Sequence, residues 1–472
     1  MSKSDKLGVA ILAAGLGKRI GKKVAKPLVP LMGMKLVDYP LSAAINFSKE
    51  NDLESSFGIV VGHQKEDVQK YLENRDTIKM SFPVQKEQLG TADALKSYYV
   101  GCDWAKDTDY TMVLCADTPL LSKNELTTLW KTLKNNNWDA IAASFNVENP
   151  YGYGRMIRSE KGFSIVEEKD ANEDQRKITE VNSGLYIAKT SYILEQLSGI
   201  DSNNEAGEFY LTDIFKPNLN VGIECFPDAQ SFLGVNNPIQ LEEALFVLKK
   251  KINTFHQKRG VHILDSQNTY IEASVEIGKG TTIYPGSYLH GNTQIGSECM
   301  IEPGAIIKDS KVADETSIRA YSYLESALVA KKCAIGPYAR LRPGTDIGEE
   351  TKIGNFVEIK KAKLGSKVGV SHLSYVGDAE IGENVNIGCG FITCNYDGAE
   401  KHLTKIGKNS FIGSDTQMIA PINIGESAFV ASGSTINQDV PDQGFAISRG
   451  RQVTKEKLAA KFLRGKWAIK KD

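Results

Sequence analysis

The sequence is poor in cysteine, and none of its seven cysteines forms a C-x-x-C pair with another. An odd number without that spacing argues against a disulfide framework and a thiolate zinc site. The chain also lacks an apolar run near the roughly 18 residues of a membrane-spanning helix. The short apolar run after Lys6 is followed at once by cations, which argues against a secretory signal. We therefore expect a reducing cytoplasm and no membrane partner.

An excess of charge of either sign is absent as well. Lys and Arg total 57 against 58 Asp and Glu, which gives a net charge of −1. This balance supplies no global electrostatic reason to bind nucleic acid or an anionic membrane surface. Anion binding must therefore be local. The 472 residues are enough for two or three domains, each with its own core.

What is present divides the chain into unlike halves. From Leu7 to about Pro238, apolar runs such as "GVAIL" and "YTMVLCA" alternate with segments of helical period. That alternation predicts an α/β, Rossmann-like domain over residues 1–238, with a mostly parallel sheet and ligands at the carboxyl ends of its strands. Apolar residues at helical spacing then predict a linking helix over residues 239–259.

Six-residue repeats fill most of the second half. In "IGKGTT IYPGSY LHGNTQ" and many later stretches an aliphatic residue opens each hexad. This pattern predicts a left-handed parallel β-helix over residues 260–472, with roughly nine or ten coils between Ile271 and Val440. The phase breaks at Lys331–Ala334 and Ile392–Thr404 predict loops that leave the helix. The basic tail from Gln443 is either a solvated terminal helix or a source of cations for coenzyme A phosphates.

The glycine-rich stretch "LAAGLGKRIGKKVAKPL" (Leu12–Leu28) matches neither of two familiar phosphate motifs. Ile20 stands where a dinucleotide fingerprint needs its third glycine, and Arg19 stands where a Walker A loop needs Ser or Thr. What remains is a glycine turn whose N–H groups can approach an anion, with Arg19 and Lys26 able to neutralise a polyphosphate. A solvated basic turn is the alternative.

Further motifs give this stretch a context. "LAAGLGKR" and "KPL" are followed in order by "QLGTADA", "CADTPLL", "YGYGR", "IVEEKDA", "VNSGLY" and "GVNN". The series resembles the nucleotidyltransferases that join a sugar 1-phosphate to a nucleoside triphosphate. With the β-helix attached, the whole chain resembles the bacterial bifunctional family of N-acetylglucosamine-1-phosphate uridyltransferase and glucosamine-1-phosphate acetyltransferase. The resemblance implies synthesis of UDP-N-acetylglucosamine, a precursor of peptidoglycan, from glucosamine 1-phosphate, acetyl-CoA and UTP.

The resemblance also implies roles in the first half. Arg19 and Lys26 would be catalytic, Asp117 and Asn236 would be the Mg²⁺ ligands, and hard oxygen donors suit that ion. Taken alone, Asp117 would fit a helix N-cap equally well, and Glu167 would fit a solvated surface charge. Residues implied to bind UTP or the product are Leu12, Ala13, Ala14, Gly15, Lys26, Gln85, Gly90, Thr91, Gly154, Glu167, Asn182 and Asn236.

In the second half, His372 stands out because Val370 is the ladder position of "VSHLSY", which directs His372 outward. The resemblance implies that His372 is the general base of acetyl transfer. It also implies a homotrimer whose sites draw on more than one chain. Residues implied to bind the sugar phosphate are Arg342, Lys360, Tyr375 and Asn386, and those implied to bind acetyl-CoA are Cys389, Asn395, Tyr396, Ser414, Ser432 and Arg449.

The sequence departs from the family pattern at four of these places. Ala116 stands where the family has Gly before Asp, and Lys18 stands where it has Thr; Cys389 and Ser432 stand where it has Ala. The first two bear on nucleotide and sugar selectivity. A second function stays open: a sugar-phosphate nucleotidyltransferase whose β-helix serves only assembly.

Overall fold

The structure is a computed structural model that describes residues 4–15, 24–73, 79–463 and 465–468. The chain divides into two compact units, Met1–Lys251 and Ile252–Asp472. Helix α7 (Pro238–Lys258) contains the residue at which they divide and covers most of the linker predicted over residues 239–259. Among the described residues, none of the helices has both the length and the apolar character needed to cross a membrane.

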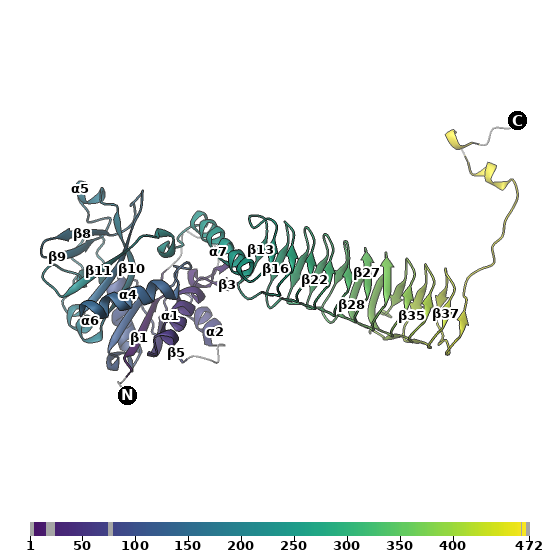
Figure 1. Cartoon of the computed structure of the whole chain (residues 1–472), viewed down its shortest axis with the longest axis horizontal. Helices are drawn as coiled ribbons and strands as arrows, with labels where there is room; N and C mark the ends of the chain where they lie inside the picture. Colours follow the sequence, from purple (N-terminus) through teal and green to yellow (C-terminus); the bar gives the residue numbers. More distant parts are fainter. Residues whose placement is uncertain (1–3, 16–23, 74–78, 464, 469–472) are drawn as a thin grey trace. The chain divides into compact units, whose positions relative to one another are not determined.

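The first unit is built on a nine-stranded sheet with the order β11-β7-β10-β6-β1-β4-β5, to which β8 and β9 are attached (Figure 1). Strand β1 pairs in parallel with both β4 and β6, whereas β10 runs antiparallel to β6 and β7. The predicted mostly parallel α/β sheet is therefore confirmed. The strands are β1 (Lys6–Leu12), β4 (Glu54–Val60), β5 (Met80–Ser81), β6 (Tyr110–Cys115), β7 (Ala140–Asn146), β8 (Arg155–Ser159), β9 (Gly162–Val166), β10 (Glu180–Lys189) and β11 (Val221–Phe226).

Helices cover this sheet, and its central strand is apolar on both faces. In β1, Val9 and Ile11 belong to one buried cluster while Ala10 belongs to the other. A parallel strand covered on both faces needs such a continuous apolar run, which is why "GVAIL" predicted it. The α-helices are α1 (Asp38–Glu50), α2 (Lys65–Glu73), α3 (Thr91–Gly101), α4 (Lys123–Asn136), α5 (Glu173–Arg176) and α6 (Thr190–Leu197), with the small hairpin β2 (Pro30–Leu31) and β3 (Met34–Lys35) before α1.

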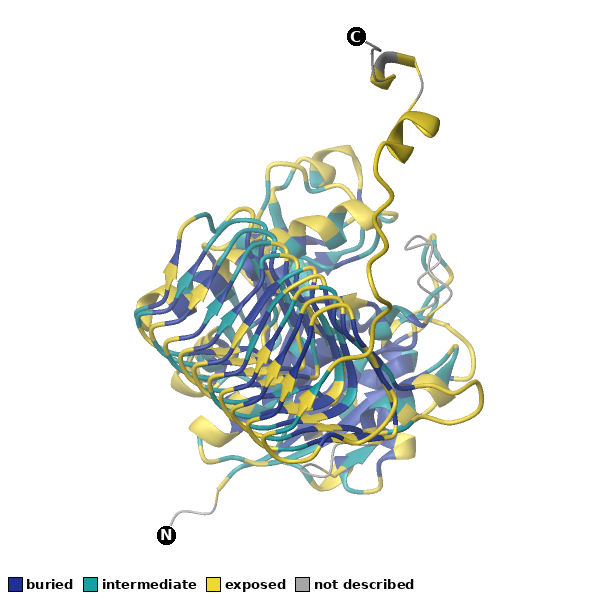
Figure 2. Cartoon of the chain, turned by 90° about the vertical axis from the view of Figure 1, so that its right-hand side faces the viewer, coloured by how far each residue is buried: buried dark blue, intermediate teal, exposed yellow. Residues whose placement is uncertain are grey.

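The second unit is the β-helix, in which each coil stacks on the one before (Figure 1). Figure 2 shows buried residues inside the coils and exposed residues at their corners. The aliphatic ladder is buried, and Thr and Ser side chains behind it bond to backbone carbonyls, as Thr281 does to Gly296 at 2.7 Å. One face consists of β12 (His262–Ile263), β15 (Thr282–Ile283), β18 (Met300–Ile301), β21 (Ser317–Ile318), β24 (Ala334–Ile335), β27 (Lys352–Asn355), β29 (Gly369–His372), β31 (Asn386–Ile387), β34 (Phe411–Ile412), β37 (Phe429–Val430) and β39 (Phe445–Ala446).

The expected number of coils is confirmed: between residues 271 and 440 the face just described has nine strands, from β15 to β37, and β12 and β39 extend it on either side. One detail of the predicted β-helix is wrong. No loop leaves the helix at Lys331–Ala334, where β23 (Leu328–Val329) leads to β24 through an ordinary turn. The loop predicted at Ile392–Thr404 is confirmed: it runs from β32 (Ile392–Cys394) to β33 (Thr404–Ile406).

The basic tail from Gln443 begins with β39, and its described residues beyond that strand are exposed. These residues form only two short 3-10 segments, Leu458–Lys461 and Gly465–Trp467, and not the terminal α-helix that the sequence suggested.

Candidate active sites

A hollow of about 380 Å³ opens where β1 and β6 end in the first unit. Leu12 and Cys115 are register partners at these carboxyl ends, which is where an α/β sheet binds ligands. Arg19 and Lys18 lie outside the described residues, and Ala116, the departure from the family pattern, lines the hollow. The residues predicted to contact UTP that also line it are Leu12, Ala13, Ala14, Gly15, Lys26, Gln85, Gly90 and Thr91.

Gln85 is held in one orientation inside this hollow. Its amide nitrogen donates to the carbonyl oxygen of Gly90 at 3.0 Å and to a carboxylate oxygen of Asp93 at 2.9 Å. Both donor hydrogens are thereby used, which leaves its carbonyl oxygen as an acceptor for a ring N–H. Gly90 has φ +118, and a β-carbon there would lie 2.7 Å from the backbone nitrogen of Phe209, so only glycine fits.

Lys26 meets both predicted metal ligands at the edge of the hollow. Its ammonium donates to Asp117 and, at 2.8 Å, to the side-chain oxygen of Asn236. The backbone N–H of Val235 donates to the carbonyl oxygen of Asp117 at 2.8 Å, which ties the loop before α7 to the end of β6. Three distant parts of the chain thus place two side-chain oxygen atoms around the ammonium group of Lys26.

A second hollow, of about 210 Å³, adjoins the first, and both are lined by Cys115 and Asp117. Gly154, Glu167, Asn182 and Asn236, all predicted to bind the sugar nucleotide, line this second hollow. Burial raises the pKa of the Cys115 thiol to about 12, with the nearby Asp117 adding to the shift. The Cys115 thiol therefore stays protonated at pH 7, so Cys115 lines the hollow and does not act as a nucleophile.

Glu167 and Asn182 are each held by a neighbour that sequence reasoning missed. The Thr212 hydroxyl donates to Glu167 at 3.2 Å, and the amide of Asn182 donates to the Tyr186 hydroxyl at 2.7 Å. Burial raises the pKa of the Glu167 carboxyl; Thr212 opposes the shift, and nearby carboxylates, Asp170 first, reinforce it. The site therefore contains a carboxyl group that holds its proton more tightly than usual.

Four of the six residues predicted for acetyl-CoA follow one corner of the β-helix together with His372. Backbone hydrogen bonds join successive coils there, from Gly390 to Leu373 at 3.2 Å, from Asp415 to Cys389 at 2.7 Å, and from Gly433 to Ser414 at 2.8 Å. The guanidinium of Arg449 donates to the carbonyl oxygen of Ser432 at 2.9 Å. We call this line the corner ridge: His372, Cys389, Ser414, Ser432 and Arg449, all of which are exposed.

The histidine of the corner ridge has a side-chain partner. The Nδ1 atom of His372 lies 2.7 Å from Oδ1 of Asn355, its register partner on the neighbouring strand β27. Asn355 was not singled out from the sequence. Asn386, predicted to bind the sugar, is the register partner of Gly369 at the other end of the same strand β29.

Cations gather on the adjoining face, on β28 (Glu358–Leu364) and beside it. Arg342 follows β25 (Arg340–Leu341) and donates to Glu358 at 2.8 Å. Contact with Lys401 is the main cause that lowers the pKa of Lys360, and Arg342 adds to it. Lys401 comes from the loop after β32 and was missed by sequence reasoning. Three positive side chains near one another are a charge arrangement that could neutralise a doubly charged anion such as a phosphate monoester.

The loop after β32 is fixed by its own polar contacts. The amide of buried Asn395 donates to Asp378 at 2.5 Å, and the hydroxyl of exposed Tyr396 donates to the carbonyl oxygen of Gly398 at 2.6 Å. Asp397 lies 2.6 Å from His402. The backbone N–H of Glu400 and then His402 lower the pKa of the Asp397 carboxyl, so it stays ionised and fastens the loop. Asn395 and Tyr396 thereby lie directly after β32, which pairs with β30 (Tyr375–Ile381) through Ile392 and Tyr375.

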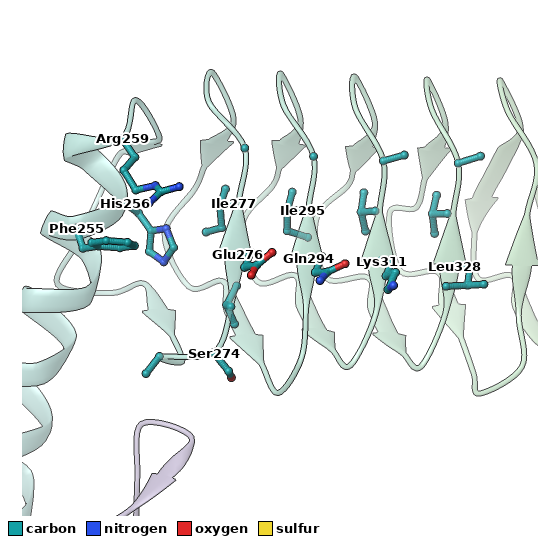
Figure 3. A pocket seen from close by; sticks show the side chains of 18 of the residues that line it. Phe255, His256, Arg259, Ser274, Glu276, Ile277, Gln294, Ile295, Lys311 and Leu328 are labelled. Atoms are coloured by element: carbon teal, nitrogen blue, oxygen red, sulfur yellow. The ribbon is translucent and has the colours of Figure 1, made fainter. Parts of the chain in front are cut away.

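A hollow of about 1030 Å³ lies elsewhere on the β-helix, along its first coils (Figure 3). Glu276, Gln294, Lys311 and Leu328 form a row on successive coils, with His256 near its beginning. The described residues that line it include none of those predicted for either reaction.

Profiles of known protein families match the two units separately. The profile described as Nucleotidyl transferase matches residues 9–225, and the one described as GMPPB C-terminal domain matches residues 267–346. By fold and site the protein is therefore a nucleotidyltransferase that carries a β-helix. Proteins called Bifunctional protein GlmU are similar over almost the whole chain. The one from Geotalea uraniireducens is 41% identical and covers 96% of this chain and 98% of its own; that from Clostridioides difficile is 40% identical, with 94% and 96% covered; that from Brevibacillus brevis is 40% identical, with 98% of each.

The chain belongs to this bifunctional GlmU family. The resemblance drawn from the motifs is confirmed, and the protein is an enzyme of UDP-N-acetylglucosamine synthesis with both an acetyltransferase and a uridyltransferase activity. Because the relatives span both units, the β-helix is more than the assembly module that the alternative function required. Nucleotidyltransferases of this family use a divalent metal.

Proposed function

We propose that each unit carries one of the two transfers. The α/β unit would join UTP to N-acetylglucosamine 1-phosphate at the two adjoining hollows, and the corner ridge of the β-helix would transfer acetyl from acetyl-CoA to glucosamine 1-phosphate. The first assignment is supported by the meeting of Lys26, Asp117 and Asn236 between the two hollows. The second is supported by the common ridge of His372 and four of the six residues predicted for acetyl-CoA.

In the uridylyl transfer, a phosphate oxygen of the sugar 1-phosphate attacks the α-phosphorus of UTP. The new O–P bond forms as the bond to the β-phosphate breaks, and pyrophosphate leaves with the electron pair. Such a step needs alignment and charge neutralisation more than a covalent nucleophile. Lys26 and Arg19 would neutralise the triphosphate, while Gln85 and Thr91 would hold uracil. Gly154, Glu167 and Asn182 would hold the sugar.

Asp117 and Asn236 are the proposed ligands of Mg²⁺. Their fit is supported by the two side-chain oxygens that converge on the Lys26 ammonium, which stands in for a hard cation. Among the described residues there is no group of three or more His, Cys, Asp or Glu suited to a metal. The two oxygen ligands from Asp117 and Asn236 suit an ion that takes its other ligands from phosphate and water. When bound, the ion would neutralise phosphate charge.

In the acetyl transfer, the amine of glucosamine 1-phosphate attacks the thioester carbon. The C–N bond forms, the C–S bond breaks, and His372 accepts the proton that the amine loses. Coenzyme A leaves as a thiolate and takes a proton back from the imidazolium. Arg342 and Lys360 would bind the phosphate, and Tyr375 and Asn386 the sugar. The acetyl-CoA contacts would come from the corner ridge and from Asn395 and Tyr396.

A homotrimer in a reducing cytoplasm completes the proposal. Tyr321, Tyr338, Phe356 and Leu373 are exposed in successive coils, and the first three rings stack with centroids 5.2 and 5.4 Å apart. This apolar line ends beside His372, where a neighbouring copy would cover it and complete the site. Light scattering should give three times the 51.7 kDa of one chain. The mass of one chain would contradict the trimer.

The experiment that tests the division of labour measures both products in the same samples. Thiol release from acetyl-CoA, with and without glucosamine 1-phosphate, is compared in wild type and His372→Ala, and pyrophosphate release from UTP and N-acetylglucosamine 1-phosphate is the matched control. We expect sugar-dependent thiol release in wild type, its loss by roughly 10²–10⁴-fold in His372→Ala, and unchanged pyrophosphate release. Sugar-dependent thiol release that survives in His372→Ala would remove His372 from the mechanism.

A further inference from the structure

We propose that Asn355 is a positioning residue for acetyl transfer, which fixes the His372 ring in the tautomer whose Nε2 can accept a proton. The inference rests on the proposed role of His372 as the base. This residue was assigned no role from the sequence, and the inference comes from the contact between two neighbouring coils.

The backbone brings the two side chains together. Asn355 ends β27 and His372 ends β29, and the two are partners in the parallel register. The N–H of Leu373 donates to the carbonyl oxygen of Asn355 at 3.0 Å, which fixes the corner next to the imidazole. A β-carbon on Gly354 would lie 2.6 Å from the carbonyl carbon of Ser371, so a residue without a side chain is needed for this approach. The strand spacing thus places the carboxamide beside the ring.

The chemistry of the contact selects one tautomer. Oδ1 of Asn355 is an amide oxygen and can only accept a hydrogen bond, so the Nδ1 atom 2.7 Å away must carry the hydrogen. In the neutral ring the lone pair is then on Nε2, at the far side from Asn355. A ring without this partner would turn about its side-chain bonds and exchange between tautomers. Asn355 therefore keeps the basic nitrogen directed away from β27, toward the substrate side.

The partner is neutral, and the two strands paired with β29 bring no charged side chain to the end of the strand where His372 lies. Of the described strands that pair with β29, β27 contains one charged residue, Lys352 at its opposite end, and β31 contains none. Asn355 consequently orients His372 without adding a negative charge that would stabilise imidazolium. A carboxylate at position 355 would keep the acceptor but raise the pKa of His372, because an adjacent opposite charge favours the protonated ring. This difference separates positioning from a merely structural contact.

The test compares Asn355→Ala and Asn355→Asp with wild type, using kcat for thiol release against pH at saturating substrates. For Asn355→Ala we expect kcat to fall about tenfold or more at every pH, but by less than in His372→Ala. For Asn355→Asp we expect the acidic limb of the profile to move up by about one pH unit, with kcat recovering toward wild type at high pH. Ser274→Ala is the matched control, because it removes another coil-to-coil hydrogen bond, 2.7 Å long, from an exposed side chain.

A second measurement does not depend on turnover. The rate at which diethyl pyrocarbonate modifies His372 is measured against pH by mass spectrometry of the peptide that contains it. The midpoint of this pH profile should move up in Asn355→Asp by the same amount as the acidic limb of the kcat profile. The inference would be overturned if the midpoint in Asn355→Asp equalled that of wild type and kcat in Asn355→Ala also equalled that of wild type. Loss of the proposed function looks different, since His372→Ala would then keep sugar-dependent thiol release. Unchanged pyrophosphate release in all variants shows that the first unit is folded, and a circular dichroism spectrum equal to that of wild type shows the same for the second unit, which contains the substitutions.

Discussion

The ammonium group of Lys26 donates a hydrogen bond to the side-chain oxygen of Asn236 across 2.8 Å, although 210 residues separate them in the chain. The same nitrogen bonds to Asp117. One lysine therefore competes with any metal ion for the oxygens proposed to bind it. If the metal and the triphosphate bind as proposed, the ammonium would be free to turn to the phosphates.

The first prediction concerns this competition. Replacing Lys26 with Ala should lower kcat for pyrophosphate release by roughly 10²–10³-fold, because a cation that stabilises transition-state charge is lost. The same change should lower the Mg²⁺ concentration that gives half-maximal activity, since the rival cation is gone. Thiol release from acetyl-CoA is the internal control and should not change. A half-saturating Mg²⁺ concentration that rises in Lys26→Ala would contradict the competition.

The second prediction uses the raised pKa of Glu167. The unfolded chain ionises this carboxyl at about its ordinary value of 4.5, whereas the folded protein holds the proton to higher pH, mainly because of burial. The stability contributed by the protonated form is therefore present below pH 4.5 and is lost as the pH rises through the folded-state pKa. Glu167→Gln cannot ionise, so we expect its Tm to exceed that of wild type by roughly 2–4 °C at pH 8. The excess should disappear near pH 4.5.

Tryptophan fluorescence suits this measurement, because Trp104, Trp130 and Trp138 all lie in the first unit and only Trp467 lies in the second. Glu160→Gln is the matched control, since Glu160 is an exposed glutamate of the same unit. Its Tm should follow wild type at each pH. Equal curves for Glu167→Gln and wild type at pH 8 would mean that burial does not penalise the Glu167 carboxylate.

The fold and the candidate sites differ in how much of each the sequence predicts. Hexads predicted the β-helix and an outward His372, because the alternation of a strand fixes which side chains face the core. Asn355 was missed, since its contact depends on the stacking of one coil on the next. The loop expected at Lys331–Ala334 was wrong because a coil tolerates an irregular hexad within an ordinary turn. Asp93, which orients Gln85, is equally hidden, because the contact depends on the path of the chain before α3.

The third prediction tests how Tyr375 is held. A β-carbon on Gly377 would lie 2.6 Å from Cζ of Tyr375, so the ring rests in space that a glycine leaves open. Gly377→Ala should displace the ring and raise KM for glucosamine 1-phosphate by about tenfold, a loss of about 1.4 kcal/mol in binding. The effect acts through the ring, so adding Gly377→Ala to Tyr375→Ala should change KM little. Additive effects of the two substitutions would contradict this account.

The fourth prediction concerns Cys389 on the corner ridge. Its thiol is exposed, as is that of Cys225 in the first unit, whereas Cys299 and Cys333 are buried and burial raises the pKa of Cys333 to about 11. If acetyl-CoA binds along the ridge, it should slow alkylation of Cys389 several-fold at saturation, because bound ligand blocks access to the sulfur.

Peptide mass spectrometry can follow Cys389 and Cys225 in one sample, so Cys225 serves as the matched control. Acetyl-CoA should leave Cys225 unaffected, and UTP should not protect Cys389. Equal labelling of Cys389 with and without acetyl-CoA would remove this residue from the binding site. Protection that is lost in Arg449→Ala would extend the site along the ridge, because Arg449 and Ser432 are joined by a hydrogen bond at its far end.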